Sequence, residues 1–317
     1  MSGLLSLRPS HLLADPAGSV QVVVDSIARN VAAEAWFYGQ MAAALALGLV
    51  IDLIRRRDLV GRYGAKSVRV DLVYGLVELT HLVQFAVILP VGLAFTRGLQ
   101  AWAPGLRVEA LAALPVAAQL LILFVFTDFC VYWWHRLQHE SRIVWQFHKT
   151  HHSQVHLNVL TTFRATVIDR IVAFAVLAVP AAMMQVDASL PVAIFALLQF
   201  HQLIIHSDSG WRLGPLDRVF VSPSFHEVHH SSLAPHLDRN YGGVLSIWDH
   251  LFGTWAPRGE QPLQYGLVAE RLPESWLRQQ WVPILGLWRL HRERTRPAAA
   301  APILAPALTP APAEPST

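Results

Sequence analysis

Runs of apolar residues long enough to cross a lipid bilayer dominate the first two thirds of the chain. A membrane-spanning helix needs about 20 predominantly apolar residues, and three runs reach that length, at residues 35–54, 72–95 and 110–134. Two shorter runs, at residues 171–186 and 190–205, predict two short spans or a hairpin that enters the membrane and returns. Only 15% of the 317 residues are charged, against roughly 25% in a soluble domain. We therefore predict an all-α integral membrane protein with four to five transmembrane or re-entrant helices.

Basic residues between the apolar runs predict the orientation of the chain. Residues 55–69 hold six Lys or Arg side chains and one acidic side chain, whereas the loop between the second and third runs holds only Arg97 and Arg107. The positive-inside rule places residues 55–69 in the cytoplasm, so the chain returns to the cytoplasm at His135 and again at His206. We expect a bacterial inner (cytoplasmic) membrane. The sequence has no basic stretch interleaved with stacking aromatic residues, so a nucleic-acid partner is not expected.

Eight of the 16 histidines form three clusters whose spacing suits a metal site. Offsets of three or four residues place the rings on one face of a helix, where they can reach the same ion. One such cluster is more often a packing or surface feature, but three on one side of a membrane indicate a metal centre in a cytoplasmic helical cap. The clusters are His135 and His139; His148, His151 and His152; and His226, His229 and His230.

The number of imidazoles predicts two metal ions. A single zinc takes three or four protein ligands, fewer than the eight rings available. Cys130 is the only cysteine, so neither a thiolate site nor a disulfide framework is possible. Imidazole suits iron, zinc or copper, so the spacing leaves the identity of the metal open.

Two further histidines lie at the end of the fifth apolar run. His206 is at the membrane edge nearest the clusters and is predicted to be a ligand. His201 is five residues earlier, about 140° around a regular helix, and is either a ligand or a hydrogen-bonding group within the bundle. Asp128 lies two helical turns before His135 on the same face, where it could orient a ligand ring.

The remaining sequence divides by composition. Residues 275–296 mix Trp and Arg side chains, which predicts an interfacial amphipathic helix, and the Ala/Pro-rich tail predicts disorder. The predicted segments are residues 1–34 as an N-terminal segment, 35–109 as two spans and a basic loop, 110–265 as the catalytic domain, 266–296 as the interfacial helix region, and 297–317 as the tail.

The order of these motifs resembles the sterol desaturase/fatty acid hydroxylase superfamily of integral membrane di-iron oxygenases. The resemblance covers roughly residues 70–265, and its nearest branch contains alkylglycerol monooxygenase and bacterial sterol-desaturase-like proteins. It includes an HxxxH motif at a helix end, an HxxHH motif shortly after, a hydrophobic hairpin and a second HxxHH motif. Further matching stretches are Asp128 to Arg136, Phe200-His201, Ile205-His206-Ser207, Gly214-Pro215-Leu216, Ser222-Pro223, Asn240-Tyr241-Gly242 and Trp248 to Thr254.

The resemblance implies two irons, O₂ as co-substrate, and hydroxylation or desaturation of a lipid C–H bond. It also implies a lipid substrate that enters from the bilayer and a separate electron donor of the ferredoxin, cytochrome or pterin type. Asp128, Asp238 and Asp249 are then candidates to accept hydrogen bonds from ligand rings. Two positions depart from the family pattern: Arg164-Ala165-Thr166-Val167 lacks the usual histidine, and His250 replaces an Arg or Lys.

Two other classes of protein share part of the pattern. His226, Glu227 and His230 also satisfy the HExxH motif of zinc peptidases, in which the glutamate is the general base, but a peptidase leaves the other two clusters without a role. A metal transporter or a metal-binding membrane protein without chemistry is the second alternative. A transporter would place its ligands near the midplane of the bilayer.

Overall fold

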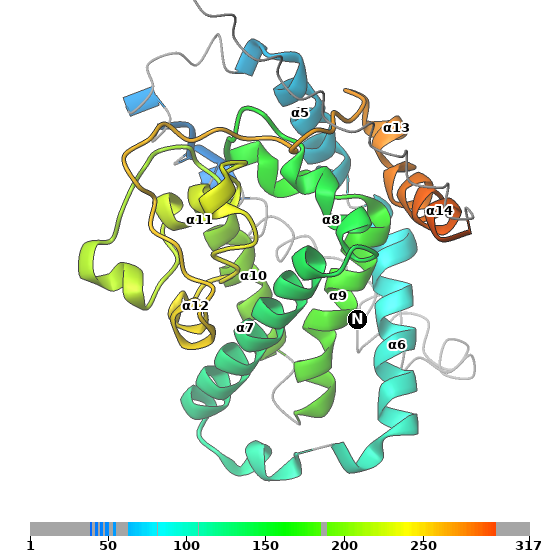
Figure 1. Cartoon of the computed structure of the whole chain (residues 1–317). Coiled ribbons are helices and arrows are strands. Elements are labelled where there is room, and N and C mark those ends of the chain that lie inside the picture. Colours follow the sequence, from blue (N-terminus) through cyan, green and yellow to red (C-terminus); the bar gives the residue numbers. More distant parts are fainter. Residues whose placement is uncertain are drawn as a thin grey trace, which may run out of the picture.

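A computed structural model of the chain describes residues 63–295 except 81, 107 and 185–188, together with scattered residues between 39 and 54. The described residues form helices joined by turns and loops, and no strand occurs among them (Figure 1). The predicted run at residues 35–54 and the predicted tail at 297–317 lie largely or wholly outside the described residues.

One long helix, α7 (Val116–Glu140), organises the fold. In the described part of the chain it is the only helix both long and apolar enough to cross a membrane. It begins after Pro115, whose extended backbone ends the preceding turn, rather than at the predicted residue 110. The segment from Val116 to Trp134 is about 28 Å long at 1.5 Å per residue, close to the roughly 30 Å of a bilayer's hydrocarbon core. The histidines His135 and His139 follow directly after this apolar segment.

The prediction of one spanning helix at residues 72–95 is wrong, because the structure divides this run between two helices. Helix α5 (Lys66–Leu79) ends just before Thr80, and a π-helical turn, Gln84–Ile88, leads into α6 (Leu89–Trp102). The Thr80 hydroxyl donates to the carbonyl of Val77 at 2.7 Å, a local bond of the kind that competes with helix continuation. Near the same break, Glu78 forms an ion pair with Arg170 at 3.0 Å.

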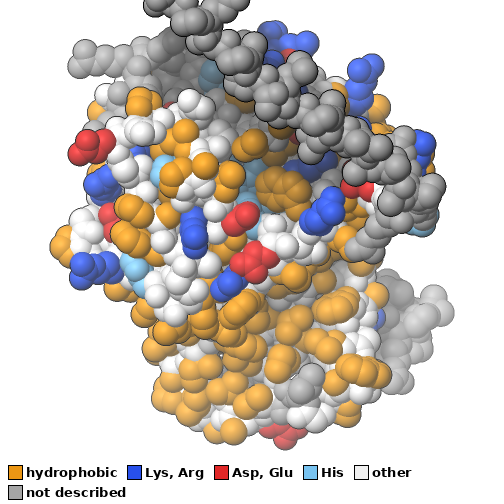
Figure 2. All heavy atoms as spheres, viewed as in Figure 1, with side chains coloured by type: hydrophobic (Ala, Val, Ile, Leu, Met, Phe, Trp, Pro, Cys, Tyr) orange, Lys and Arg blue, Asp and Glu red, His pale blue; other side chains and the backbone are white. Residues whose placement is uncertain are grey.

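The two shorter apolar runs form helices α9 (Val167–Met183) and α10 (Ser189–Ile205). Thr166 caps α9, since its side chain accepts a hydrogen bond from the backbone N–H of Asp169. Helix α9 packs against α6 and α7, and α10 also contacts α7. Apolar side chains cover most of this part of the molecule, whereas charged side chains gather at the end where α7 terminates (Figure 2).

Short helices surround the C-terminal end of α7 (Figure 1). Helix α14 packs against α8, and α11 packs against the end of α10. The predicted helix at 275–296 is divided into α13 and α14, because the chain turns at Gln280 and Trp281, ahead of Pro283. These helices are α8 (Trp145–His152), α11 (Pro223–His229), α12 (Ile247–Phe252), α13 (Trp276–Gln279) and α14 (Val282–Thr295).

A buried ion pair between Arg164 and Asp71 ties α8 to α5. Both side chains are at most 2% exposed. Arg164 also donates to the carbonyls of Thr150 and Ser67, both at 3.2 Å. The carboxylate of Asp71 accepts further hydrogen bonds from the side chains of Gln154, Asn158 and Thr161. This network fixes the end of α8 that carries the second histidine cluster.

Replacing Asp71 with alanine should therefore strongly destabilise the protein. The substitution leaves the Arg164 guanidinium buried without its counter-charge, a loss of about 3–5 kcal/mol. The matched control is Glu274→Ala, which removes the exposed pair between Lys66 and Glu274 and should cost only about 0–1 kcal/mol. Denaturant titration of both variants in one detergent measures the difference. Equal losses would show that the buried network does not stabilise the fold.

Candidate metal centre

Nine imidazole rings converge where α7 ends, in two adjacent groups. Within each group the candidate ligand atoms all lie within 4.8 Å of one another. The first group contains His135, His139, His148, His152 and His229. The second contains His151, His206, His226 and His230. All eight histidines of the predicted clusters are therefore brought together, with His206 as the ninth.

Each ring is held by a short, rigid stretch of backbone. His135 and His139 project from one face of the last two turns of α7, as their spacing predicts. The second cluster lies on α8 and the third on α11, whose first turn is capped by the Ser222 hydroxyl. His206 follows the last residue of α10. Neighbouring positions 151 and 152 point into different groups, which brings the two groups side by side.

Backbone carbonyls fix the orientation of three rings. Nδ1 of His135 lies 2.8 Å from the carbonyl oxygen of Tyr241. Nδ1 of His229 lies 2.9 Å from the carbonyl oxygen of Arg239, and Nδ1 of His206 lies 2.6 Å from that of Gln202. A carbonyl oxygen only accepts, so Nδ1 carries the hydrogen in all three rings and Nε2 presents a lone pair.

The Nε2 atoms are crowded in a way that neutral imidazoles cannot satisfy by themselves. In the second group, Nε2 of His226 lies 3.1 Å from Nε2 of both His206 and His230, and His206 is 3.1 Å from His151. Nε2 of His206 carries no hydrogen, so its contact with His226 is a hydrogen bond only if Nε2 of His226 carries one. That nitrogen has a single hydrogen and then no lone pair, so its contact with His230 is not a hydrogen bond as well. Two nitrogens at right angles, each about 2.1 Å from one ion, are about 3.0 Å apart, so the spacing fits metal ligands.

The first group fits a metal for the same reason. Nε2 of His152 lies 3.1 Å from Nε2 of both His139 and His229. Nε2 of His135 and both ring nitrogens of His148 are buried and have no hydrogen-bond partner among the described residues. Buried polar atoms are normally paired, so unpaired nitrogens in a cluster of rings indicate where ions bind.

Burial keeps rings in both groups neutral at physiological pH. Loss of solvation lowers the pKa of His229 to about 3 and that of His206 to about 4. It lowers the pKa of His226 and His230 well below the usual value, and the neighbouring histidines add to the effect. Neutral imidazole is the form that binds metal, so no proton has to leave these rings before an ion binds.

His201 lies outside both groups. Its Nε2 is 3.0 Å from the carbonyl of Val221, the packing role that was one of the two predicted alternatives.

The three predicted aspartates differ in what they contact. Asp238 lies 3.4 Å from Nδ1 of His139, the arrangement expected of a carboxylate that orients a ligand ring. Asp249 accepts hydrogen bonds from the backbone N–H groups of Tyr241 and Gly242, both at 2.8 Å, and so holds the carbonyl that His135 uses. Asp128 instead binds the segment that leads into α12, accepting from Val244, Leu245 and Trp248.

Asp169 is a further carboxylate that the sequence did not single out. It lies 3.7 Å from Nδ1 of His148 and accepts a hydrogen bond from Gln138 at 2.8 Å. Its only sequence signal is a place in the first turn of α9, which reads as an ordinary helix start. No sequence signal identifies the carbonyls of Arg239 and Tyr241 either, because any residue supplies the same backbone oxygen.

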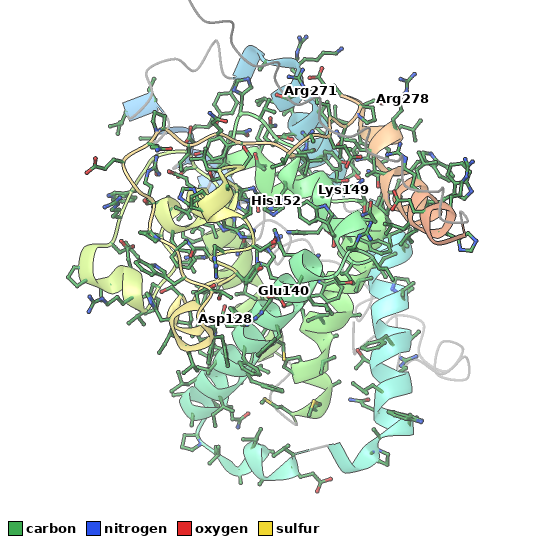
Figure 3. All side chains as sticks on the ribbon, viewed as in Figure 1. Asp128, Glu140, Lys149, His152, Arg271 and Arg278 are labelled. Atoms are coloured by element: carbon green, nitrogen blue, oxygen red, sulfur yellow. The ribbon has the colours of Figure 1, made fainter. Side chains whose placement is uncertain are left out.

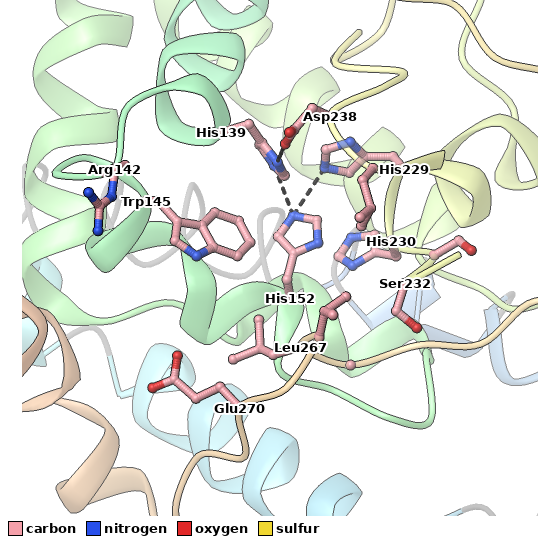
Figure 4. Close-up of a pocket in the computed structure, with 14 residues that line it drawn as sticks. His139, Arg142, Trp145, His152, His229, His230, Ser232, Asp238, Leu267 and Glu270 are labelled. Carbon is pink, nitrogen blue, oxygen red and sulfur yellow. Dashed lines mark hydrogen bonds and ion pairs between the residues drawn. The ribbon is translucent and has the colours of Figure 1, made fainter. Parts of the chain in front are cut away.

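A pocket of about 300 Å³ opens onto the two groups (Figure 4). Its floor contains His139, His152, His229 and His230. The Trp145 ring lies beside this floor, 5.1 Å from the His139 ring and 5.5 Å from the His152 ring, measured between centroids. The pocket wall combines apolar side chains with Arg142, Asp238 and Glu270.

A helical bundle that ends in two adjacent imidazole groups defines a class of histidine-rich metalloprotein. Comparison with known proteins narrows the class, because residues 120–254 match the family model described as fatty acid hydroxylase. The similarity to that family extends over this part of the chain, which is less than half of its 317 residues. No solved structure matches the chain significantly.

Several curated proteins are similar to the chain over part of its length. An alkylglycerol monooxygenase of Danio rerio is 36% identical over 151 residues, which are 46% of this chain and 32% of that protein. The ornithine lipid hydroxylase OlsE of Rhizobium tropici is 38% identical over 143 residues, covering 44% and 43%. The Delta(7)-sterol 5(6)-desaturase ERG3A of Gibberella zeae is 23% identical over 177 residues, covering 56% and 44%. The chain thus spans less than half the length of these relatives.

The geometry predicts different effects for substitutions at His201, which lies on α10, and at His206, which directly follows it. His206→Ala should reduce the metal bound per chain, because its Nε2 lies between two other Nε2 atoms of the second group. His201→Ala should leave metal content unchanged, because the ring bonds to a carbonyl outside both groups. Elemental analysis of both proteins after anaerobic purification measures the difference. Equal metal loss in both variants would show that His201 also supports the centre.

Proposed function

We propose that the chain is a membrane-bound di-iron oxygenase that hydroxylates or desaturates a lipid C–H bond with O₂ and external reducing equivalents. The observation that carries this proposal is the pair of adjacent imidazole groups with inward-facing Nε2 atoms. Two irons held there would supply O₂ activation and the oxidation of an unactivated C–H bond. The ligands are the nine converging histidines: His135, His139, His148, His151, His152, His206, His226, His229 and His230.

The side chains around the groups have their own tasks in this proposal. Backbone carbonyls and Asp238 hold the ligand rings in one tautomer, so the donor atoms are positioned before a metal arrives. Seven of the nine histidines are buried, which limits the access of water to the groups. The apolar bundle below them offers a path along which a lipid can approach from the bilayer (Figure 2).

The names of the relatives support a lipid as the substrate class. They act on alkylglycerols, ornithine lipids and sterols according to those names, and an apolar chain or ring system is what these molecules share. We infer that electrons come from a separate donor of the ferredoxin, cytochrome or pterin type. The basic residues at positions 55–69 support a cytoplasmic location of the histidine groups in a bacterial inner membrane.

The surroundings of Glu227 argue against the zinc peptidase alternative. A peptidase base must reach a metal-bound water, but Glu227 is fully buried and forms an ion pair with Arg258. Its other carboxylate oxygen accepts a hydrogen bond from the backbone N–H of Gly210. The two groups also lie beyond the apolar part of α7 rather than at its middle, unlike the midplane site of a transporter.

Lipid oxidation under labelled oxygen tests the proposed activity. Lipid extracts from cells that express the protein, compared with cells that lack it, should contain a lipid that gains one oxygen atom or one double bond. Growth under ¹⁸O₂ should place the heavy isotope in any new hydroxyl group, since O₂ is the oxygen source. The His229→Ala variant should abolish the change, because it removes a ligand of the first group.

Glu227→Gln is the matched control for that experiment. Glutamine keeps the acceptor for Gly210 and removes only the charge that faces Arg258, a side chain that is 21% exposed, so activity should fall by no more than about 10-fold. A hydrolase gives the opposite pattern, in which Glu227→Gln is inactive and His229→Ala is active. Unchanged lipids in cells that accumulate the iron-loaded protein would contradict the oxygenase proposal itself.

A further inference from the structure

An exposed apolar surface lies in the segment after α10. It is formed by a 3₁₀ turn, Gly214–Arg218, by α12, and by the residues that directly follow each of them. We call this surface the collar. Leu251 is 66% exposed and Leu216 is 55% exposed, although both are large apolar side chains. The other exposed apolar members of the collar are Val219, Phe220, Ile247 and Trp255.

Backbone hydrogen bonds join the two parts of the collar. The N–H of Val221 donates to the carbonyl of Val244 at 2.8 Å, and the N–H of Ser246 donates to Val219 at 3.0 Å. The Ser246 hydroxyl also donates to the carbonyl of Asp217 at 2.8 Å. The 3₁₀ turn and α12 therefore form one surface rather than two independent loops.

The inner face of α12 is fixed against α7 at a known height. The Trp248 indole N–H donates to Asp128 at 2.9 Å, and its ring lies 5.2 Å from that of Phe129. The Phe252 ring lies 5.0 Å from that of Trp133. Figure 3 shows Asp128 on α7 beside α12. Helix α12 is therefore level with residues 128–133 of α7.

That height coincides with the end of the apolar part of α7. If Val116 to Trp134 fills the hydrocarbon core, residues 128–133 occupy about the last 10 Å of it. Ile247 and Leu251 are one helical turn apart on α12 and are both exposed, whereas Trp248 and Phe252 contact α7. The exposed face of α12 is thus directed away from α7 at the depth where lipid begins.

The charges of the collar fit the same location. Arg212 and Arg218 are exposed next to its apolar side chains, where they can reach lipid phosphates. Asp217 between them is partly buried and accepts a hydrogen bond from the backbone N–H of Leu213 at 3.0 Å. Apolar side chains combined with neighbouring Arg residues are typical of surfaces that lie in the membrane interface.

We propose that the collar is embedded in the boundary between phospholipid headgroups and acyl chains, on the side of the membrane where the histidine groups lie. The partner is the phospholipid bilayer, and the exposed face of α12 provides the apolar contact. The cap is then attached to the membrane beside α7 as well as through it, and the collar fixes its height above the lipid. This inference depends on α7 crossing the membrane and not on the reaction.

Site-specific fluorescent labelling in vesicles tests this placement. One cysteine is added to the chain, at Leu251 or at Leu216, labelled with an environment-sensitive fluorophore and compared with two controls of similar exposure. Leu121→Cys, on the face of α7, is the lipid control at 62% exposure, and Val268→Cys, beside the pocket, is the water control at 61%. The unsubstituted chain with its half-buried Cys130 is the blank. The vesicles contain phosphatidylcholine and phosphatidylglycerol, with or without a nitroxide on the acyl chain.

The collar labels should behave like the lipid control. Their emission should shift to the blue, and the acyl-chain nitroxide should quench them, while the label at position 268 should respond only to a water-soluble quencher. Quenching at positions 251 and 216 by the water-soluble agent alone would overturn the proposal. Protection from both quenchers would also overturn it, since a second copy or another protein would then cover the collar.

Discussion

The orientation of the imidazole rings is the constraint on which the rest of the structure depends. Carbonyls of Tyr241, Arg239 and Gln202 hold hydrogens on Nδ1, so the Nε2 lone pairs of three rings are directed into a buried interior. Gathering lone pairs at separations of 3.1 Å is unfavourable unless a cation lies among them. The rings nevertheless take these positions, because helices and buried polar networks determine where each ring lies, independently of any ion.

Those networks connect the centre to the apolar helices of the bundle. Asp71 and Arg164 hold the second histidine cluster against α5, and Asp249 holds the loop that orients His135. Asp128 joins α7 to the collar. The three carboxylates, Asp71, Asp249 and Asp128, are buried, and each accepts hydrogen bonds from several donors. Such an arrangement rigidifies a site and is costly to break. The ends of the helices are therefore fixed to one another through polar contacts as well as through apolar packing.

The sequence predicted the ligand candidates better than it predicted their supports. Spacing of three and four residues is enough to align rings on α7, α8 and α11, and the order of the clusters predicted that the rings would meet. Asp169 and Arg164 were missed because their partners are distant in sequence and their positions look like ordinary helix starts and loops. The run at 72–95 was predicted as one span because hydropathy averages over Thr80, whose side chain bonds to the backbone where α5 ends.

The iron content of the intact protein tests the central claim most directly. Protein purified anaerobically in detergent from iron-supplemented cells should contain about two irons per chain, since two groups of imidazoles are available and each can hold one ion. Mössbauer spectroscopy of ⁵⁷Fe-enriched protein should show that the irons belong to one site with nitrogen ligands. One tightly bound zinc per chain, with no iron before or after anaerobic reconstitution, would contradict the account.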